Sequence, residues 1–217
     1  MQITMLIYPG MTALDFMGPA QVWAYWPGAE VQTVWKTVEP IPTDSAAVYL
    51  PNADFAGAFD APDILFVPGG TAGTFALMQD EEVLGFLREK AAAAQWVTSV
   101  CTGALVLGAA GLLDGYRATT HWSALDMLPN FGAETVRDRW VIDRDRATGG
   151  GVTAGMDFGL ALMAEIAGED VAKAVQLAVE YAPAPPFRSG TPEEAGEEIT
   201  AMVNAMFAEQ LAASGGG

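Results

Sequence analysis

The feature that most constrains the fold is residues 96–113, where a short apolar strand is followed almost at once by a helix of small residues. Val97 to Val100 is typical of a strand that ends inside the protein. Gly103 to Ala110 is rich in Ala and Leu, which favours a helix. Cys101, the only cysteine among the 217 residues, lies at the turn between them. This order predicts a sheet whose strands lead directly into helices.

The turn at Cys101 also has chemical consequences. A side chain on a sharp strand-to-helix turn projects above the sheet edge, beside the N–H groups and the positive dipole end of the helix. A helix N-terminus lowers the pKa of a thiol from about 8.5 toward neutrality, so the pattern predicts a nucleophilic thiolate. The alternative is that Cys101 is a small buried apolar residue, as most free cysteines are.

Other segments repeat the same order of strand, turn and helix. Residues 3–8 form a short apolar run, and residues 64–67 form a continuous one, which is typical of a parallel strand buried on both faces. Residues 80–94 predict a helix, with acidic residues early and basic residues late, as the helix dipole favours. The sequence therefore predicts an α/β sandwich with a mainly parallel sheet. We expect one domain over residues 1–213 and a flexible tail over residues 214–217.

Ligand sites in such sheets form beyond the carboxyl ends of the strands. Three candidates follow predicted strands: Asp15, the pair Gly69-Gly70, and Cys101. Asp15 is the only charged residue between Met11 and Trp26, which predicts a buried carboxyl with a raised pKa that can exchange a proton. Its alternative role is a helix N-cap. Gly69 and Gly70 could direct N–H groups at a ligand, or could form an ordinary turn.

The C-terminal half of the chain predicts a hairpin and several helices. Residues 139–142 and 146–148 flank a polar turn, as the arms of a hairpin do. Residues 152–167 predict a long apolar helix. Residues 182–187 contain three prolines and should lie extended over the surface. Thr191, followed by Pro192, is expected to cap one final amphipathic helix.

Charge and composition exclude several classes of protein. With 27 acidic and 10 basic residues the net charge is −17, which argues against a nucleic-acid partner and favours a neutral or cationic small molecule. No run of about 18 apolar residues predicts a membrane helix. The N-terminal residues predict a strand rather than a signal peptide, and a single cysteine is compatible with the cytoplasm.

The sole histidine, His121, precedes Trp122 at the start of a predicted helix. It could activate the Cys101 thiol, but a helix-start histidine bonded to neighbouring backbone is the simpler interpretation. Trp122 and Trp140 are most simply core or pocket-wall aromatic residues. One cysteine and one histidine cannot supply the usual ligands of a transition metal, and no Gly-x-Gly-x-x-Gly motif follows a strand. We therefore expect neither a metal nor a dinucleotide cofactor.

Four motifs together resemble the DJ-1/PfpI superfamily across nearly the whole domain: Asp15-Phe16-Met17-Gly18-Pro19, Phe66-Val67-Pro68-Gly69-Gly70, Val100-Cys101-Thr102-Gly103-Ala104 and Ala118-Thr119-Thr120-His121-Trp122. The resemblance implies a flavodoxin-like three-layer sandwich with a cysteine nucleophile elbow. Asp15 in place of Glu, and Thr102 directly after the cysteine, are most similar to the isocyanide hydratase group. The same differences count against protease and glyoxalase activity.

This resemblance implies a cofactor-free lyase that hydrates a neutral isocyanide to an N-substituted formamide. Cys101 would form a covalent thioimidate, Asp15 would act as general acid and base, and Thr102 would stabilise developing charge. The implied substrate-binding residues are Gly69, Gly70, His121 and Trp122. Relatives are commonly homodimers, and residues 182–190 are a reasonable place for contact between chains.

Two other functions remain open on the sequence alone. A reactive thiol beside a carboxyl group is also what a redox or stress sensor needs, with Cys101 oxidised rather than catalytic. Related sequences also occur as ligand-binding domains of transcriptional regulators, in which the cysteine would have no catalytic role.

Overall fold

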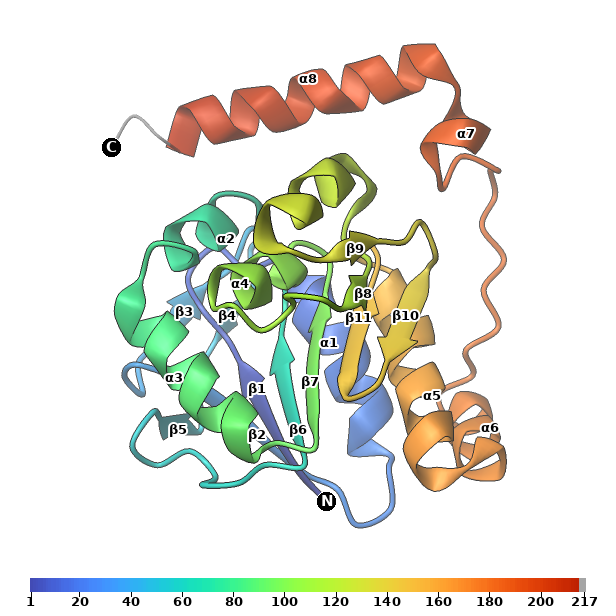
Figure 1. The fold of residues 1–217 in the computed structure, drawn as a ribbon. Coiled ribbons are helices and arrows are strands. Elements are labelled where there is room, and N and C mark those ends of the chain that lie inside the picture. Colours follow the sequence, from blue (N-terminus) through green and yellow to red (C-terminus); the bar gives the residue numbers. More distant parts are fainter. Residues whose placement is uncertain (215–217) are drawn as a thin grey trace.

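The computed structural model describes residues 1–214, and a seven-stranded sheet forms their centre (Figure 1). The strand order is β10 (Trp140–Asp143), β11 (Arg146–Gly149), β7 (Trp96–Val100), β6 (Ile64–Val67), β1 (Gln2–Leu6), β2 (Glu30–Trp35) and β5 (Ala53–Asp54). All neighbouring pairs are parallel except β10 with β11. The carboxyl ends of β1, β6 and β7 therefore meet at one edge, as predicted.

Helices cover both faces of this sheet (Figure 1). On one face α1 packs against α5, and α5 packs against α6. On the other face α4 contacts both α2 and α3. The bounds of these helices are α1 Ala13–Ala24, α2 Thr71–Leu77, α3 Glu81–Ala93, α4 Gly103–Ala109, α5 Ala154–Ala167 and α6 Glu169–Ala178. The three-layer sandwich expected from the sequence is confirmed.

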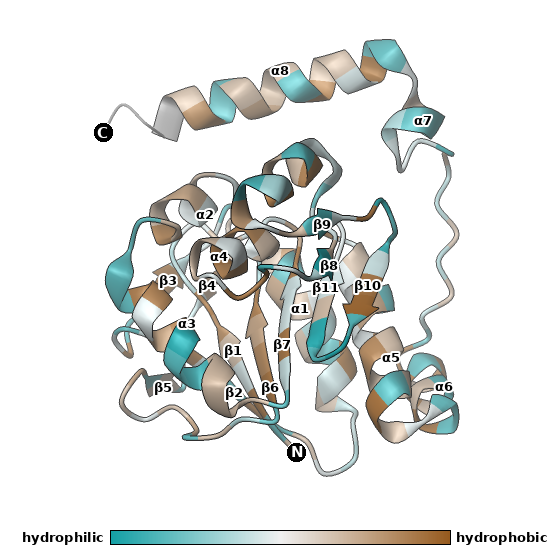
Figure 2. Ribbon diagram, in the orientation of Figure 1, coloured by the Kyte–Doolittle hydropathy of each residue, from teal (hydrophilic) through white to brown (hydrophobic). Residues whose placement is uncertain are grey.

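The core lies between the sheet and its helices, and the central strands β1 and β6 are among the brown, hydrophobic parts of the ribbon (Figure 2). Every residue of β6 is buried, which explains its continuous apolar sequence. Trp23 of α1 contacts Phe66 of β6 edge-on at 5.4 Å and Phe158 of α5 at 6.1 Å between ring centroids. Because buried aromatic side chains contribute strongly to core energetics, these rings fix α1 and α5 against the sheet.

Four short strands and one 3₁₀ helix complete the sandwich. Strand β3 (Ile41–Pro42) pairs with β4 (Val48–Tyr49), and β8 (Arg117–Ala118) pairs with β9 (Glu134–Thr135). The helix expected to begin at His121-Trp122 is the 3₁₀ helix η1 (Trp122–Phe131).

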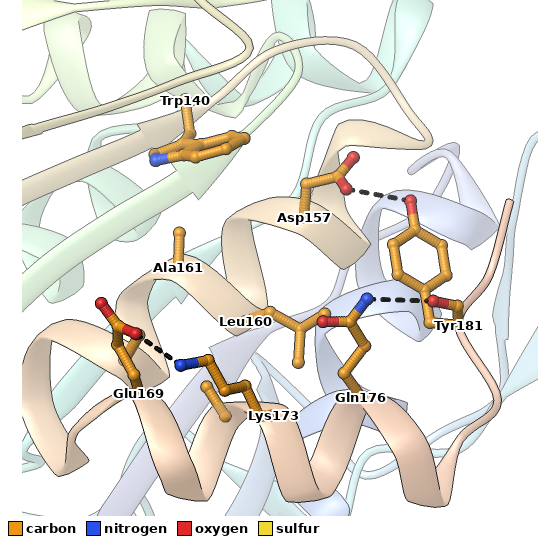
Figure 3. Close-up of a pocket in the computed structure, with 10 residues that line it drawn as sticks. Trp140, Asp157, Leu160, Ala161, Glu169, Lys173, Gln176 and Tyr181 are labelled. Atoms are coloured by element: carbon orange, nitrogen blue, oxygen red, sulfur yellow. Dashed lines mark hydrogen bonds and ion pairs between the residues drawn. The ribbon is translucent and has the colours of Figure 1, made fainter.

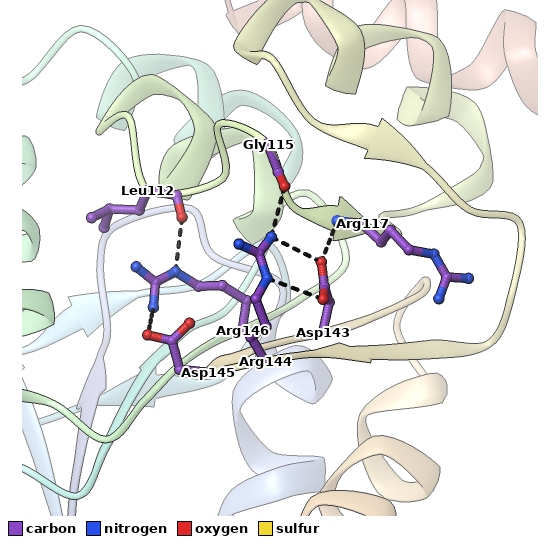
Figure 4. Close-up of polar contacts among 7 residues, drawn as sticks. All are labelled: Leu112, Gly115, Arg117, Asp143, Arg144, Asp145 and Arg146. Carbon is purple, nitrogen blue, oxygen red and sulfur yellow. Dashed lines mark hydrogen bonds and ion pairs between the residues drawn. The ribbon is translucent and has the colours of Figure 1, made fainter.

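The predicted hairpin is confirmed as β10 and β11, and a polar cluster attaches it to the preceding loop (Figure 4). Asp143 accepts the N–H of Arg117 at 2.9 Å and pairs with Arg144 at 3.2 Å. The Arg144 guanidinium lies 3.7 Å from the ring centroid of Tyr116, and Arg146 donates to the Leu112 carbonyl at 2.8 Å. These contacts hold residues 112–118 in place, directly before the Thr119–Trp122 segment that reaches the site.

The C-terminal part differs from the sequence prediction. Thr191 does cap a helix, but that helix, α7 (Pro192–Ala195), ends at Gly196 with φ of 81°, and a separate helix α8 (Glu197–Ser214) follows. Glycine adopts this left-handed conformation without a Cβ clash, so the chain changes direction there. Ser214, expected to begin a tail, is the last residue of α8, and residues 215–217 lie outside the described residues.

Over residues 1–214, none of the helices combines the length and the apolar character that crossing a membrane requires.

Candidate active site

Cys101 occupies a strained turn between β7 and α4. Its φ is 56°, a left-handed conformation that costs a residue other than glycine about 1–3 kcal/mol. Backbone contacts hold it there: the Cys101 N–H donates to the carbonyls of Gly149 at 3.1 Å and Gly150 at 2.9 Å. The Thr120 hydroxyl donates to the Cys101 carbonyl at 2.7 Å. The sharp turn predicted at Cys101 is therefore present, and β11 and the Thr120 segment both support it.

Close packing of two glycines makes this turn fit the sheet edge. A Cβ added to Gly103 would overlap the carbonyl of Val67, so only glycine lets the start of α4 lie against the end of β6. A Cβ added to Gly69 would lie 2.6 Å from the Thr102 nitrogen and 2.7 Å from Oδ2 of Asp15. The absence of a side chain at Gly69 thus brings α1, β6 and α4 together at one point.

Asp15 lies in the first turn of α1 and is fully buried, which confirms the buried-carboxyl prediction over the N-cap alternative. Its Oδ2 accepts the Gly69 N–H at 3.0 Å, whereas Oδ1 has no hydrogen-bond partner among the described residues. Burial raises the pKa of Asp15 to about 7, against the opposing effects of the Cys101 thiol and the Gly69 N–H. Asp15 can therefore gain or lose a proton near neutral pH.

The pKa of Cys101 is shifted in the opposite direction to that expected from the sequence. Only 5% of the residue is exposed, and burial followed by the nearby Asp15 raises the thiol pKa well above its usual value. The backbone N–H groups of Val152 and Thr102 stabilise the thiolate and act the other way, but they do not outweigh burial. Because the two groups influence each other, Cys101 and Asp15 titrate as a coupled pair.

Thr102 is the centre of a partly buried hydrogen-bond chain. Its Oγ1 accepts the Gly70 N–H at 3.0 Å and lies 2.8 Å from the Thr74 hydroxyl. The Tyr8 hydroxyl, 3.3 Å from that of Thr74, donates to the Pro68 carbonyl at 3.0 Å. The Gly70 N–H is therefore bonded within the protein, to Thr102.

His121 forms local contacts at the start of η1 rather than a bond to the thiol. The Ser123 N–H donates to Nδ1 at 3.3 Å, and the Ser123 hydroxyl lies 2.8 Å from the same nitrogen. Burial lowers the pKa of His121, which favours the neutral imidazole. The simpler of the two sequence interpretations, a helix-start histidine bonded to neighbouring backbone, agrees with these contacts.

A cavity of about 330 Å³ adjoins the cysteine turn. Its walls include His121 and Trp122 and also Thr120 and Val152, which contact Cys101 directly. Residues 190–193 complete the wall, and they begin the C-terminal arm, defined as residues 190–214 with helices α7 and α8. Among the predicted residues, His121 and Trp122 line this cavity, whereas Cys101, Asp15, Gly69 and Gly70 do not.

A second hollow of about 340 Å³ lies over α5 and α6 and contains none of the predicted site residues (Figure 3). Trp140, expected in the core or a pocket wall, lies at its rim and is 41% exposed. Tyr181 donates to Asp157 at 3.1 Å, and Lys173 pairs with Glu169 at 2.6 Å. Asp157 also pairs with Arg139, so each ionic group that lines this hollow already has a partner of opposite charge.

Sequence reasoning missed Val152, whose N–H contacts the Cys101 sulfur. Its φ of 31° is rare for a β-branched residue. The run Gly149-Gly150-Gly151 was the available signal, because it lets β11 pass close to the cysteine turn before α5 begins. Tyr8 and Thr74 were also missed, since neither lies in a motif that indicates chemistry.

The amino-acid sequence is similar to known proteins over most of its length. The family model described as "DJ-1/PfpI family" matches residues 1–165. The isonitrile hydratase of Pseudomonas putida is 51% identical over 201 residues, which cover 92% of this chain and 86% of that protein. The regulator GbdR of Pseudomonas aeruginosa is 34% identical over 124 residues, only 33% of its length.

A solved structure of a similar protein shows the same fold. A THiJ/PfpI family protein from Pseudomonas syringae superposes with a TM-score of 0.92 at 44% identity. That match covers 100% of this chain and 90% of the other, so it includes the C-terminal arm as well as the sandwich. With a family model matched over residues 1–165 and a relative 51% identical over most of both chains, the chain belongs to the DJ-1/PfpI family.

Proposed function

We propose that this protein is an isonitrile hydratase, a lyase that converts an isocyanide and water into an N-substituted formamide. The observation that carries the proposal is the buried pair of Cys101 and Asp15, each of which shifts the other's pKa. A thiol beside a carboxyl group provides a nucleophile together with an acid and base. The 51% identity with the isonitrile hydratase of Pseudomonas putida supports the same reaction.

The first step joins the Cys101 sulfur to the terminal carbon of R–N≡C. Asp15, as the carboxylate, takes the thiol proton while the sulfur–carbon bond forms and delivers it to the same carbon. The product is a thioimidate, R–N=CH–S–Cys101, in which the former thiol proton lies on the substrate carbon and Asp15 is a carboxylate again. A pKa of about 7 suits this exchange, because Asp15 must both accept and release a proton near neutral pH.

The second step adds water to the thioimidate carbon. Asp15, again a carboxylate, accepts one proton from the attacking water, and the other water proton passes to the substrate nitrogen as the new carbonyl forms. The carbon–sulfur bond then breaks, R–NH–CHO leaves, and the proton on Asp15 restores the thiol. One isocyanide and one water give one formamide, so no oxidant, reductant or metal enters the balance.

Backbone groups around the sulfur support both steps. The N–H groups of Val152 and Thr102 stabilise negative charge on the sulfur as the thiol proton leaves. The Thr102 hydroxyl, bonded to Gly70 and Thr74, keeps the start of α4 in register with the end of β6. We propose that Thr102 acts mainly by positioning its own N–H, and that Gly69 acts by orienting Asp15.

The surroundings suit an uncharged substrate. The cavity beside Cys101 is bordered by Trp122 and by His121, whose lowered pKa leaves it neutral. We propose that this cavity holds the organic group of the isocyanide while its terminal carbon reaches the sulfur. The net charge of −17 would repel anionic molecules and leaves a neutral substrate unaffected.

Incubation with cyclohexyl isocyanide, followed by mass spectrometry or NMR for N-cyclohexylformamide, tests the reaction. We expect catalytic formation of the formamide, at many equivalents per protein. Formation no faster than in protein-free buffer would overturn the proposed activity.

A redox sensor is the main alternative. Cys101 is 5% exposed and its pKa is raised, whereas sensor cysteines are exposed and of low pKa. Peroxide titration followed by intact mass would reveal stoichiometric oxidation at low peroxide if the sensor account were correct. A ligand-binding domain, as the partial similarity to GbdR allows, would bind isocyanide equally well after Cys101→Ser.

We further propose that residues 1–213 act as one domain and that the protein works as a cytoplasmic homodimer. Residues 182–190 are exposed throughout, and Phe187 among them is 78% exposed. A second copy of the chain would cover this apolar surface. Light scattering after size-exclusion chromatography should give twice the chain mass of 22.8 kDa, and a single-chain mass would contradict the dimer.

A further inference from the structure

Helix α8 runs across the end of the molecule at which β6 and β7 point their carboxyl ends (Figure 1). Only Thr200, Val203 and Phe207 of its described side chains are partly buried. Their spacing of three and four residues places them on one helical face. This face is therefore turned toward the body of the protein, and it contacts α2.

Phe207 contacts two residues that border the cavity beside Cys101. Its ring centroid lies 5.5 Å from that of His121, edge-on at 79°, and 6.2 Å from that of Trp122. The rings of His121 and Trp122 are 5.4 Å apart, so the three form one aromatic cluster. This cluster joins α8 to a wall of the cavity.

The start of the arm reaches the same cavity at a second place. Residues 190–193 form part of its wall, and Thr191 caps α7 through the Glu194 N–H at 3.3 Å. Between the sandwich and this point, residues 182–190 are exposed and belong to no helix or strand. The arm is thus held over the site by a few side-chain contacts, of which the Phe207 cluster is the most extensive aromatic one.

We propose that α8 covers the part of the cavity wall formed by His121 and Trp122, and that Phe207 determines which organic groups the site accepts. The inference rests on the proposed hydratase function. The isocyanide carbon must reach Cys101, so its organic group extends past Thr120 and Val152 toward Trp122 and His121. Phe207 supports these two rings from outside and so sets the shape of the apolar wall.

The test compares Phe207→Ala with Met206→Ala, a neighbouring control whose side chain is 51% exposed. The measurement is kcat/KM for methyl isocyanide and for cyclohexyl isocyanide. One methylene in an apolar pocket is worth about 10-fold or more in discrimination, so losing the supporting ring should lower the cyclohexyl-to-methyl ratio by roughly 10-fold. Phe207→Leu should recover part of the ratio. A ratio in Phe207→Ala equal to that of Met206→Ala would overturn the inference.

A second measurement does not depend on hydration. Alkylation of Cys101 by iodoacetamide and by bulky N-phenyl iodoacetamide reports access to the sulfur. Because the N-phenyl group would lie against the same apolar wall, Phe207→Ala should lower the ratio of the bulky to the small alkylation rate, and Met206→Ala should leave it unchanged. If alkylation responds in this way but no isocyanide is hydrated, the proposed function fails, whereas the proposed role of Phe207 in shaping the cavity wall is supported. If isocyanide is hydrated and both ratios stay unchanged in Phe207→Ala, the proposed role of α8 and Phe207 is wrong.

Discussion

The backbone N–H of Gly69 donates a 3.0 Å hydrogen bond to Oδ2 of Asp15, which joins the end of β6 to the first turn of α1. The bond leaves the second carboxyl oxygen buried without a hydrogen-bond partner among residues 1–214. Asp15 is thus oriented by one oxygen, and its carboxyl lies near enough to Cys101 for each group to shift the pKa of the other. In this arrangement a single carboxyl can serve both steps of the proposed reaction.

Two substitutions at Asp15 test separately whether hydration needs its exchangeable proton and whether it needs the exact position of its carboxyl. Asp15→Asn keeps the shape but cannot exchange a proton, so hydration should fall by about 10²–10⁴-fold. Asp15→Glu keeps the carboxyl but displaces it in a packed site, and it should also lower turnover. Steady-state assays with cyclohexyl isocyanide measure both effects. Full activity in Asp15→Asn would remove this residue from the mechanism.

The pH dependence of kcat/KM follows from the coupled pair. Below the Asp15 pKa of about 7 both groups are protonated, and no base is present to take the thiol proton. Above it the pair holds one proton, which is the reactive state. We expect kcat/KM to rise with pH to a plateau, with an apparent pKa near 7. A profile that is flat from pH 5.5 to 8.5 would contradict this assignment.

Stability should depend on the same group. The folded pKa of Asp15, about 7, lies above its unfolded value. The contribution of Asp15 to the free energy of unfolding is therefore complete below about pH 4 and is lost as pH rises through 7. The unfolding free energy of wild type relative to Asp15→Asn should therefore decrease by up to about 4 kcal/mol between pH 4 and pH 8.

Urea titrations at several pH values measure this difference. Asp126→Asn, at a side chain that is 98% exposed, is the matched control. If the wild type and Asp15→Asn keep a constant difference across this range, Asp15 does not titrate as described.

Replacing the nucleophile should leave the fold intact. Cys101→Ser keeps a small side chain at the turn, but an alcohol at its ordinary pKa gives almost no anion at neutral pH. We expect hydration to disappear while the circular dichroism spectrum stays unchanged. Cys101→Ala serves as a second variant without any nucleophile, and turnover by either variant would count against covalent catalysis.

The parts of the fold that the sequence predicts are those determined by local pattern. Continuous apolar strands such as residues 64–67, and the strand-to-helix turn at Cys101, follow directly from composition and spacing. Buried Asp15 was predictable because it is the lone charge in an apolar segment. Parallel topology then brings the ends of β1, β6 and β7 together without further information.

What the sequence could not give depends on contacts between distant segments. The direction of the Cys101 pKa shift depends on how deeply the turn is buried, and burial outweighs the helix N-terminus. The contact of the Val152 N–H with sulfur depends on a φ of 31° that no residue pattern reveals. The position of α8 depends on the break at Gly196 and on Phe207 meeting rings more than eighty residues earlier in the chain.

The most direct test of the central claim is rapid-quench intact mass spectrometry during turnover of cyclohexyl isocyanide. Covalent catalysis predicts a transient species heavier than the protein by one isocyanide, located on the Cys101 peptide. It should form and decay at least as fast as the formamide appears, and it should be absent in Cys101→Ala. Formamide production without any adduct on Cys101, or with undiminished rate in Cys101→Ala, would contradict the account.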